Sequence, residues 1–154
     1  MMTELDSLLT PFRVMCRIDA GSKKRIFELA AHQIASADPA LTESSVYAQL
    51  LAREKLGSTG LGQGVAIPHC RVAGCDKPVG CLITLATPVN FESSDKQPVD
   101  LLFVLLVPPE ATQEHLDILA SIAERFSRFG YCDKLRMATS DGDLLASALQ
   151  TTEH

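Results

Sequence analysis

The chain has 154 residues, the length of one domain with one hydrophobic core. Its 14 basic and 19 acidic residues give a formal net charge of −5, and its one run of basic residues is Lys23-Lys24-Arg25, so we expect no nucleic-acid partner. The longest apolar run, 101–107, is too short to cross a bilayer, and the opening MMTELDSLL is acidic where a secretion signal is basic, so we expect a soluble, cytoplasmic protein that is not inserted in a membrane.

The first half of the chain predicts two helices. In GSKKRIFELAAHQIASADP, Ser22 suits an N-cap, apolar residues recur at helical spacing, and Pro39 marks the end. In LTESSVYAQLLAREKLG, Thr42 is the expected N-cap, and Gly57 stands at the C-terminal position that favours a left-handed residue. Arg53 therefore lies in the last turns of the second helix.

The second half predicts strands followed by two more helices. The segments GVAIPH, VGCLITLA and DLLFVLLV are rich in Val, Ile and Leu, and the last two are apolar almost throughout, as strands covered on both faces are. TQEHLDILASIAERFSRF predicts the longest amphipathic helix, and SDGDLLASALQ predicts a short final helix capped by Ser140. The apolar stripe expected on the long helix is Leu119, Ile122, Phe126 and Phe129. Because helices and strands alternate, we expect an α/β domain with helices on both faces of a central sheet.

The cysteines are odd in number and form no CxxC pair, so free thiols are expected in place of a disulfide framework or a thiolate metal site. They are Cys16, Cys70, Cys75, Cys81 and Cys132.

The segment GSTGLGQGVAIPHCR, 57–71, places four glycines in eight positions just ahead of a Pro-His pair. Walker loops and dinucleotide fingerprints lie between a strand and a following helix, whereas these glycines follow a helix and precede a strand. Two interpretations remain: a plain helix-to-strand connection, or a loop whose backbone amides and hydroxyl groups approach an anion closely. The candidate residues of such a phosphate loop are Gly57, Ser58, Thr59, Gly60, Gly62 and Gly64.

His69 ends the Pro-His pair. Successive side chains of a strand point to opposite faces, which argues against a nucleophilic pair of His69 and Cys70. A zinc site that also used Cys75 and Cys81 would have irregular spacing and two adjacent ligands. A lone histidine at a strand end is most often structural, so a functional role needs further support.

His115 supplies that support. It stands three residues after Thr112, where a capping box usually has Glu or Gln, and it shares the core-facing stripe of its helix while lying in the first turn. We therefore expect it to face a cleft at the rim of the core. A helix N-terminus favours anions and a neutral imidazole, which suits hydrogen bonding to a phosphate; a hydrogen-bonded core histidine is the alternative.

The combination of REKLGSTGLGQGVAIPH, ESSDKQPVDLLFVLLVP and EHLDILASIA resembles the enzyme IIA domains of the mannitol/fructose class of the bacterial phosphoenolpyruvate:sugar phosphotransferase system. It is most similar to their stand-alone nitrogen-regulatory members. The resemblance covers 5–150 and implies a single domain with a central mixed sheet flanked by helices on both faces.

The resemblance also implies roles for single residues. The histidine of the IPH motif, His69, is transiently phosphorylated, the histidine of the EHL motif, His115, lies beside it, and Arg53 is the site arginine. The sequence has Cys70-Arg71 where the family has Gly and often Lys.

Residue chemistry agrees with this reaction. An unprotonated ring nitrogen of His69 can act as a nucleophile, while Arg53, His115 and the glycine loop can position and stabilise the phosphoryl group. We expect no cofactor and no metal, since no Asp/Glu cluster suited to Mg²⁺ stands near the motif. The resemblance implies that the donor is a small HPr-like, nitrogen-type phosphocarrier, for which the site should be a shallow cleft ringed by apolar surface.

The expected output is control of regulatory target proteins in nitrogen, potassium or carbon metabolism by the phosphorylation state. Three alternatives remain open: a fructose- or mannitol-specific enzyme IIA that passes the phosphoryl group to an enzyme IIB, a regulatory binding module without phosphotransfer, and a hydrolase or thiol enzyme, which the expected Cys-His geometry disfavours.

Overall fold

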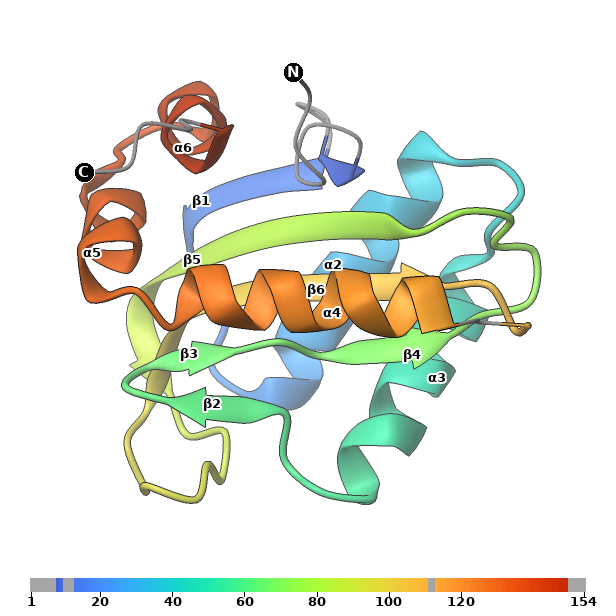
Figure 1. Ribbon diagram of the computed structural model, residues 1–154, viewed down its shortest axis with the longest axis horizontal. Coiled ribbons are helices and arrows are strands. Elements are labelled where there is room, and N and C mark those ends of the chain that lie inside the picture. The colour runs from blue at the N-terminus through green and yellow to red at the C-terminus, as the bar shows by residue number, and fades with distance from the viewer. Residues whose placement is uncertain (1–7, 10–12, 111–112, 150–154) are drawn as a thin grey trace.

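The computed structural model describes residues 8–9, 13–110 and 113–149. Its elements, coloured in chain order in Figure 1, are β1 (Val14–Ile18), α2 (Lys23–Ala37), α3 (Glu43–Lys55), β2 (Gly60–Gly62), β3 (Val65–Ala66), β4 (His69–Arg71), β5 (Val79–Val89), β6 (Val99–Val107), α4 (Gln113–Phe126), α5 (Phe129–Met137) and α6 (Asp141–Leu149).

The strands form one mixed sheet in the order β1-β5-β6-β3-β2, with β4 also paired to β6. The two long central strands, β5 and β6, are antiparallel, while β3 and β4 run parallel to β6. The expected single strand over 64–69 is divided into β3 and β4. Pro68 lies between them and has no N–H to give to the ladder, although its carbonyl accepts a hydrogen bond from Leu105 N at 2.8 Å.

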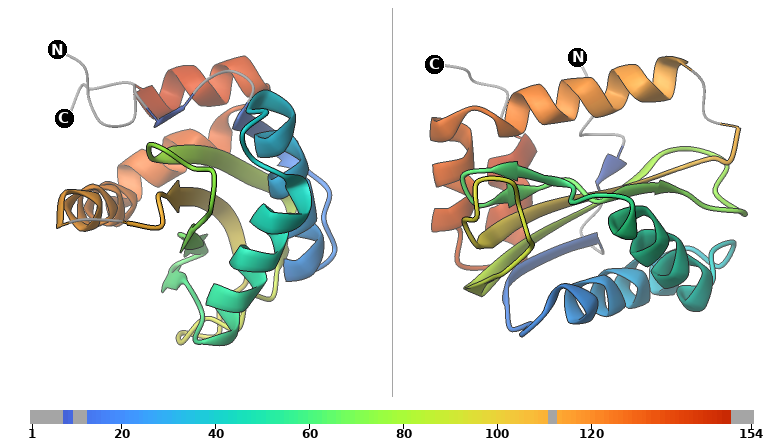
Figure 2. Two further views of the ribbon diagram at one scale, coloured as in Figure 1. Left: turned by 90° about the vertical axis from the view of Figure 1, so that its right-hand side faces the viewer. Right: turned by 90° about the horizontal axis from the view of Figure 1, so that it is seen from below.

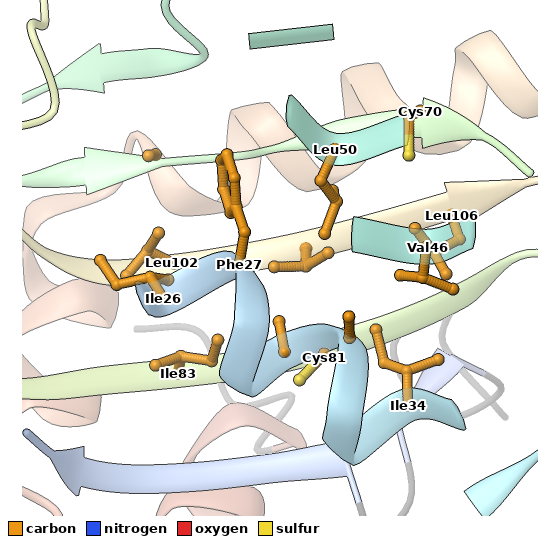
Figure 3. Packing of buried hydrophobic residues seen from close by; sticks show 14 of the residues in the cluster. Ile26, Phe27, Ile34, Val46, Leu50, Cys70, Cys81, Ile83, Leu102 and Leu106 are labelled. Atoms are coloured by element: carbon orange, nitrogen blue, oxygen red, sulfur yellow. The ribbon is translucent and has the colours of Figure 1, made fainter. Parts of the chain in front are cut away.

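Helices cover both faces of this sheet, as predicted (Figure 2). On one face, α2 and α3 pack on β5 and β6 around Phe27, Ile34, Leu50 and Leu106 (Figure 3). On the other face, Phe103 of β6 meets the buried side chains of α4, α5 and α6. Because side chains of β6 alternate between two buried layers, the strand is apolar except for Asp100, and the interpretation of DLLFVLLV is confirmed.

The predicted helix starts are confirmed where the structure describes them. Ser22, Thr42 and Ser140 each accept a hydrogen bond through the side-chain oxygen from the backbone N–H three residues on. Thr112, the expected N-cap of α4, lies outside the described residues. Gly57 follows the C-cap residue Leu56 as expected, but its φ of +156° is not the left-handed helical value.

The predicted helix over 112–129 was too long. Helix α4 ends at Phe126, where the Ser127 hydroxyl donates to the Glu124 carbonyl at 2.6 Å and so competes with the helical hydrogen bonds. Phe129 begins α5 and is 66% exposed, so its placement in the buried stripe was wrong.

Candidate functional site

A cavity of about 400 Å³ opens where three elements meet at one end of the molecule. Figure 1 shows β4, α3 and the first turn of α4 at this end. Residues from all three elements line it. Arg53 lies in α3 and Leu56 directly follows that helix. The other two elements contribute His69 and Arg71 on β4 and His115 and Leu116 on α4. The fold thus brings together the three side chains that the sequence predicted for the site, Arg53, His69 and His115.

His69 is the first residue of β4 and is half-buried. Its Nδ1 lies 2.6 Å from the carbonyl oxygen of Ile67. Because a carbonyl can only accept, Nδ1 carries the proton, and in the neutral ring Nε2 keeps its lone pair. A backbone contact two residues away therefore selects Nε2 as the nucleophilic atom.

The charge state of His69 follows from its surroundings. Burial lowers the pKa of His69 below its usual 6.5, and the positive charge of Arg53 lowers it too. The hydrogen bond to Ile67 and the negative charge of Glu54 act in the opposite direction, with a smaller total effect. The imidazole is therefore neutral at pH 7, as a nucleophile must be.

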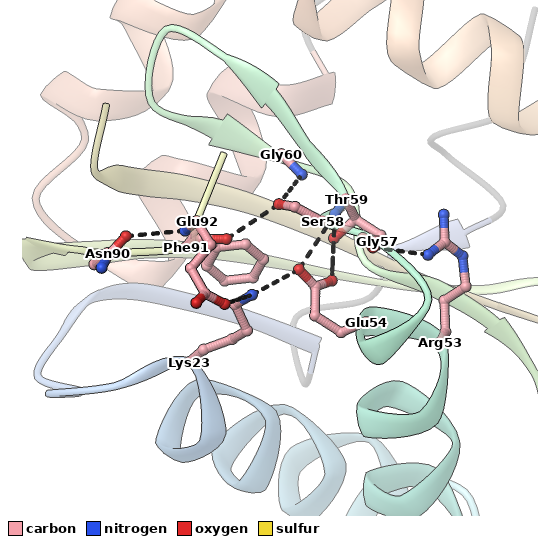
Figure 4. Close-up of polar contacts among 10 residues, drawn as sticks. All are labelled: Lys23, Arg53, Glu54, Gly57, Ser58, Thr59, Gly60, Asn90, Phe91 and Glu92. Carbon is pink, nitrogen blue, oxygen red and sulfur yellow. Dashed lines mark hydrogen bonds and ion pairs between the residues drawn. The ribbon is translucent and has the colours of Figure 1, made fainter. Parts of the chain in front are cut away.

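Arg53 reaches the cavity from the last turn of α3. Its Nη1 donates to the carbonyl of Gly57 at 2.9 Å (Figure 4). Within the described parts of the chain, no carboxylate forms an ion pair with Arg53. Its other donors and its charge are available to an anion in the cavity.

The remaining lining side chains are both polar and apolar. His115 is half-buried in the first turn of α4 and faces the cavity, as expected. Leu56 and Leu116 flank the opening and are 84% and 53% exposed. Two large apolar side chains that line the cavity are therefore open to water.

The six residues expected to form a phosphate loop are not gathered at the cavity. The Ser58 hydroxyl donates to the Phe91 carbonyl at 3.1 Å, and the Thr59 hydroxyl donates to Glu54 at 2.7 Å, so neither points to an external anion. Gly60 and Gly62 belong to β2, and Gly64 follows in a hairpin turn toward β3. The predicted role of these hydroxyls as phosphate donors is therefore corrected: both bind acceptors within the protein.

Backbone conformation and close packing explain why glycine stands at several of these positions. Gly62 and Gly64 have φ of +97° and +83°, as tight hairpins require, and a Cβ on Gly60 would collide with the Ser93 hydroxyl. The segment contributes to the cavity indirectly, because the Gly57 carbonyl accepts a hydrogen bond from Arg53, which lines it. Sequence reasoning also missed Leu56 and Leu116, since exposed leucines have no pattern of their own.

Cys70 is buried beside His69, with its side chain among the core residues under α2 and α3 (Figure 3). Burial raises the pKa of its thiol to about 12, so the reactive thiolate is absent at pH 7. All five cysteines are free, as expected. Among the described residues, no three His, Cys, Asp or Glu side chains are grouped to hold a metal ion, and no helix is long and apolar enough to cross a membrane.

Comparison with known proteins extends these observations. Residues 7–150 match the family described as the phosphoenolpyruvate-dependent sugar phosphotransferase system, EIIA 2. The chain is 47% identical over 137 residues to a nitrogen regulatory protein of Pseudomonas aeruginosa, and the match covers 89% of each chain.

Solved structures agree in fold. The nitrogen regulatory protein IIA-Ntr of Neisseria meningitidis superposes with a TM-score of 0.84 at 41% identity, covering 92% of this chain and 97% of the other. The mannitol IIA protein of Escherichia coli gives a TM-score of 0.74 at 21% identity, covering 91% and 98%, which shows the shared fold alone.

Proposed function

The chain belongs to the EIIA 2 family of the phosphoenolpyruvate-dependent sugar phosphotransferase system, and from this premise we propose that His69 accepts a phosphoryl group from an HPr-like phosphocarrier. Membership in this family implies phosphotransfer, with the chain as a phosphoryl carrier. The observation that supports His69 is its environment: a neutral imidazole in a cavity shared with Arg53 and His115. The names of the similar nitrogen regulatory proteins favour control of partner proteins over transport of a sugar.

The transfer follows from the hydrogen bonding of His69. The lone pair of Nε2 attacks phosphorus as the P–N bond to the donor histidine breaks, and the electron pair of that bond returns to the donor nitrogen. The proton on Nδ1 stays in its hydrogen bond to Ile67, so the phosphorylated ring is cationic and remains a good leaving group for the next transfer.

Arg53 and His115 have supporting roles in this proposal. The guanidinium of Arg53 stabilises the equatorial phosphoryl oxygens by charge and hydrogen bonds, and the imidazole of His115, which lines the same cavity, orients the group. The exposed Leu56 and Leu116 border the opening on which the phosphocarrier docks.

The experiment is phosphorylation by phosphoenolpyruvate and the two upstream phosphotransferase proteins, followed by intact-mass measurement. We expect one phosphoryl group per chain, stable to base and labile to acid, and none in His69→Ala. His32→Ala is the matched control, because His32 lies on α2, exposed and away from the cavity; it should be labelled like the wild type. A phosphoryl group retained in His69→Ala would contradict the proposal.

A further inference from the structure

The residue after Arg53 carries a buried carboxylate and is not among those that line the cavity. Glu54 is 8% exposed, and both of its oxygens accept hydrogen bonds. Oε1 accepts from the Thr59 hydroxyl at 2.7 Å, Oε2 accepts from Lys23 Nζ at 2.9 Å, and the Thr59 N–H lies 3.3 Å from each oxygen (Figure 4). A carboxylate is costly to bury, and here it is compensated by three donors.

Lys23 ties this carboxylate to the rest of the fold. It comes from the first turn of α2, and its ammonium group lies 4.7 Å from the centre of the Phe91 ring. The carbonyl of Phe91 in turn accepts from the Ser58 hydroxyl. The turn 57–59 is therefore fixed from α2, from α3 and from the segment after β5.

The same turn holds Arg53. The Gly57 N–H donates to the Glu54 carbonyl at 3.1 Å, while the Gly57 carbonyl accepts from Arg53 Nη1 at 2.9 Å. The position of the guanidinium therefore depends on the position of Gly57. A displacement of about 1 Å in a positioning group can lower a rate by about 10²-fold.

We propose that Glu54 is a positioning residue for phosphotransfer: its carboxylate fixes the turn 57–59, and the turn holds Arg53 at the cavity. This inference rests on the proposed reaction at His69. Neighbouring residues of one helix thus have different tasks, because Arg53 faces the phosphoryl group and Glu54 holds the backbone that orients Arg53.

The first test is Glu54→Gln, which keeps the shape of the side chain but removes its charge and directs an NH₂ group at donors. Single-turnover transfer should slow by about 10- to 100-fold. The matched control is Glu92→Gln, since Glu92 is the other carboxylate of Lys23 but its side chain is 78% exposed; its transfer rate should equal that of the wild type. Equal rates for Glu54→Gln and the wild type would overturn the proposal.

A second readout is the titration of His69 by NMR. The charged groups that act on His69 are Arg53, which lowers its pKa, and Glu54, which raises it; Arg71 and His115 share the cavity. Glu54→Gln removes a charge that raises this pKa, so the titration must be made in Thr59→Val, which keeps the carboxylate. A displaced Arg53 should raise the pKa of His69 in Thr59→Val, whereas a role in fold stability alone would leave it unchanged.

The decisive test is a double-mutant cycle. If Glu54 acts through Arg53, Glu54→Gln should slow transfer in the wild type but by no more than about twofold in an Arg53→Gln background. The same fold loss in both backgrounds would assign Glu54 to general stability and overturn the proposal.

If Glu54→Gln does not fold, Thr59 decides the same question. Thr59→Val removes one hydrogen bond to Glu54 and should slow transfer by about tenfold, with no further loss in the Arg53→Gln background, and Thr59→Ser should restore the rate. An unphosphorylated wild-type protein would contradict the proposed function itself. A phosphorylated wild type with equally fast Thr59→Val would contradict the positioning role alone.

Discussion

Arg53 and Arg136 stand near opposite ends of the glycine segment 57–64 and are held in different ways. At the Gly64 end, Arg136 Nε donates to Asp100 at 2.9 Å and its Nη2 donates to the Gln63 carbonyl at 2.9 Å, so its charge is neutralised within the protein. At the Gly57 end, Arg53 donates to one backbone carbonyl and faces a cavity. Both guanidinium groups are positively charged, but only the one held by a carbonyl has a charge that no carboxylate compensates. That charge can act on an incoming anion.

The glycines at the two ends differ in the same sense. A Cβ on Gly64 would lie 2.8 Å from Arg136 Nη2 and 3.1 Å from Asp100 Oδ1, so this glycine makes room for the ion pair. Gly57 has no atom within 4 Å of such a Cβ, and its contribution is the carbonyl that orients Arg53. The Gly64 end of the segment is therefore packed against an ion pair, and the Gly57 end orients the guanidinium of Arg53.

We expect the largest change in the phosphotransfer rate when Arg53 is replaced, and little change in that rate when Arg136 is replaced. Arg53→Gln should slow phosphotransfer by about 10²–10³-fold with a melting temperature close to the wild type, because a preorganised charge at the phosphoryl group is lost. Arg136→Gln should keep the transfer rate but destabilise the fold by about 1–3 kcal/mol, since the partly buried Asp100 loses its partner. Single-turnover transfer and thermal melting check both, and equal rate losses would remove the distinction between the two ends.

A smaller effect is expected from His115, which lines the same cavity from α4. His115→Ala should still be phosphorylated on His69 but should transfer the group about 10- to 100-fold more slowly, because the adduct loses an oriented partner. His115→Gln should recover part of this loss, since an amide can donate at similar reach. If the defect of each variant instead follows its melting temperature, His115 has a structural role.

The smallest effect is a shift in the titration of His69. Its pKa lies below 6.5 because of burial, so the ring should be more than half neutral at pH 6.5, as followed by NMR. Arg53→Gln should raise this pKa, since the nearby positive charge is removed, and Arg136→Gln should leave it unchanged. A wild-type midpoint at or above 6.5 would contradict this description of the site.

The same pKa has a consequence for stability. Between the lowered pKa and about 6.5, the unfolded chain binds more protons at this histidine than the folded chain. The contribution of His69 to stability is therefore fully present above pH 6.5 and decreases as the pH falls through this window.

The parts of the fold that were predictable have strong local patterns. The apolar run of β6 and the capped helices α2 and α3 follow from burial on both faces and from side-chain caps. Strands β1 and β2 were missed because β1 alternates little between buried and exposed positions, and β2 is three residues long with two glycines.

The candidate site was predictable only in part. Sequence motifs indicated Arg53, His69 and His115, which the fold brings to one cavity. The sequence assigned the hydroxyls of Ser58 and Thr59 to phosphate because it does not show their partners within the protein. Ser58 donates to a carbonyl 33 positions away, and Thr59 donates to the side chain of Glu54. The buried state of Glu54 was equally invisible, since a charged residue after Arg53 at a helix end is normally exposed.

The central claim is that Nε2 of His69 carries the phosphoryl group while Nδ1 keeps its proton. Long-range ¹H–¹⁵N NMR of the phosphorylated protein, labelled with ¹⁵N-histidine, distinguishes the two ring nitrogens directly. The hydrogen bond between Nδ1 and Ile67 predicts phosphorus on Nε2 of His69 and a protonated Nδ1. A phosphoryl group on Nδ1 of His69, or on His115, would contradict the account.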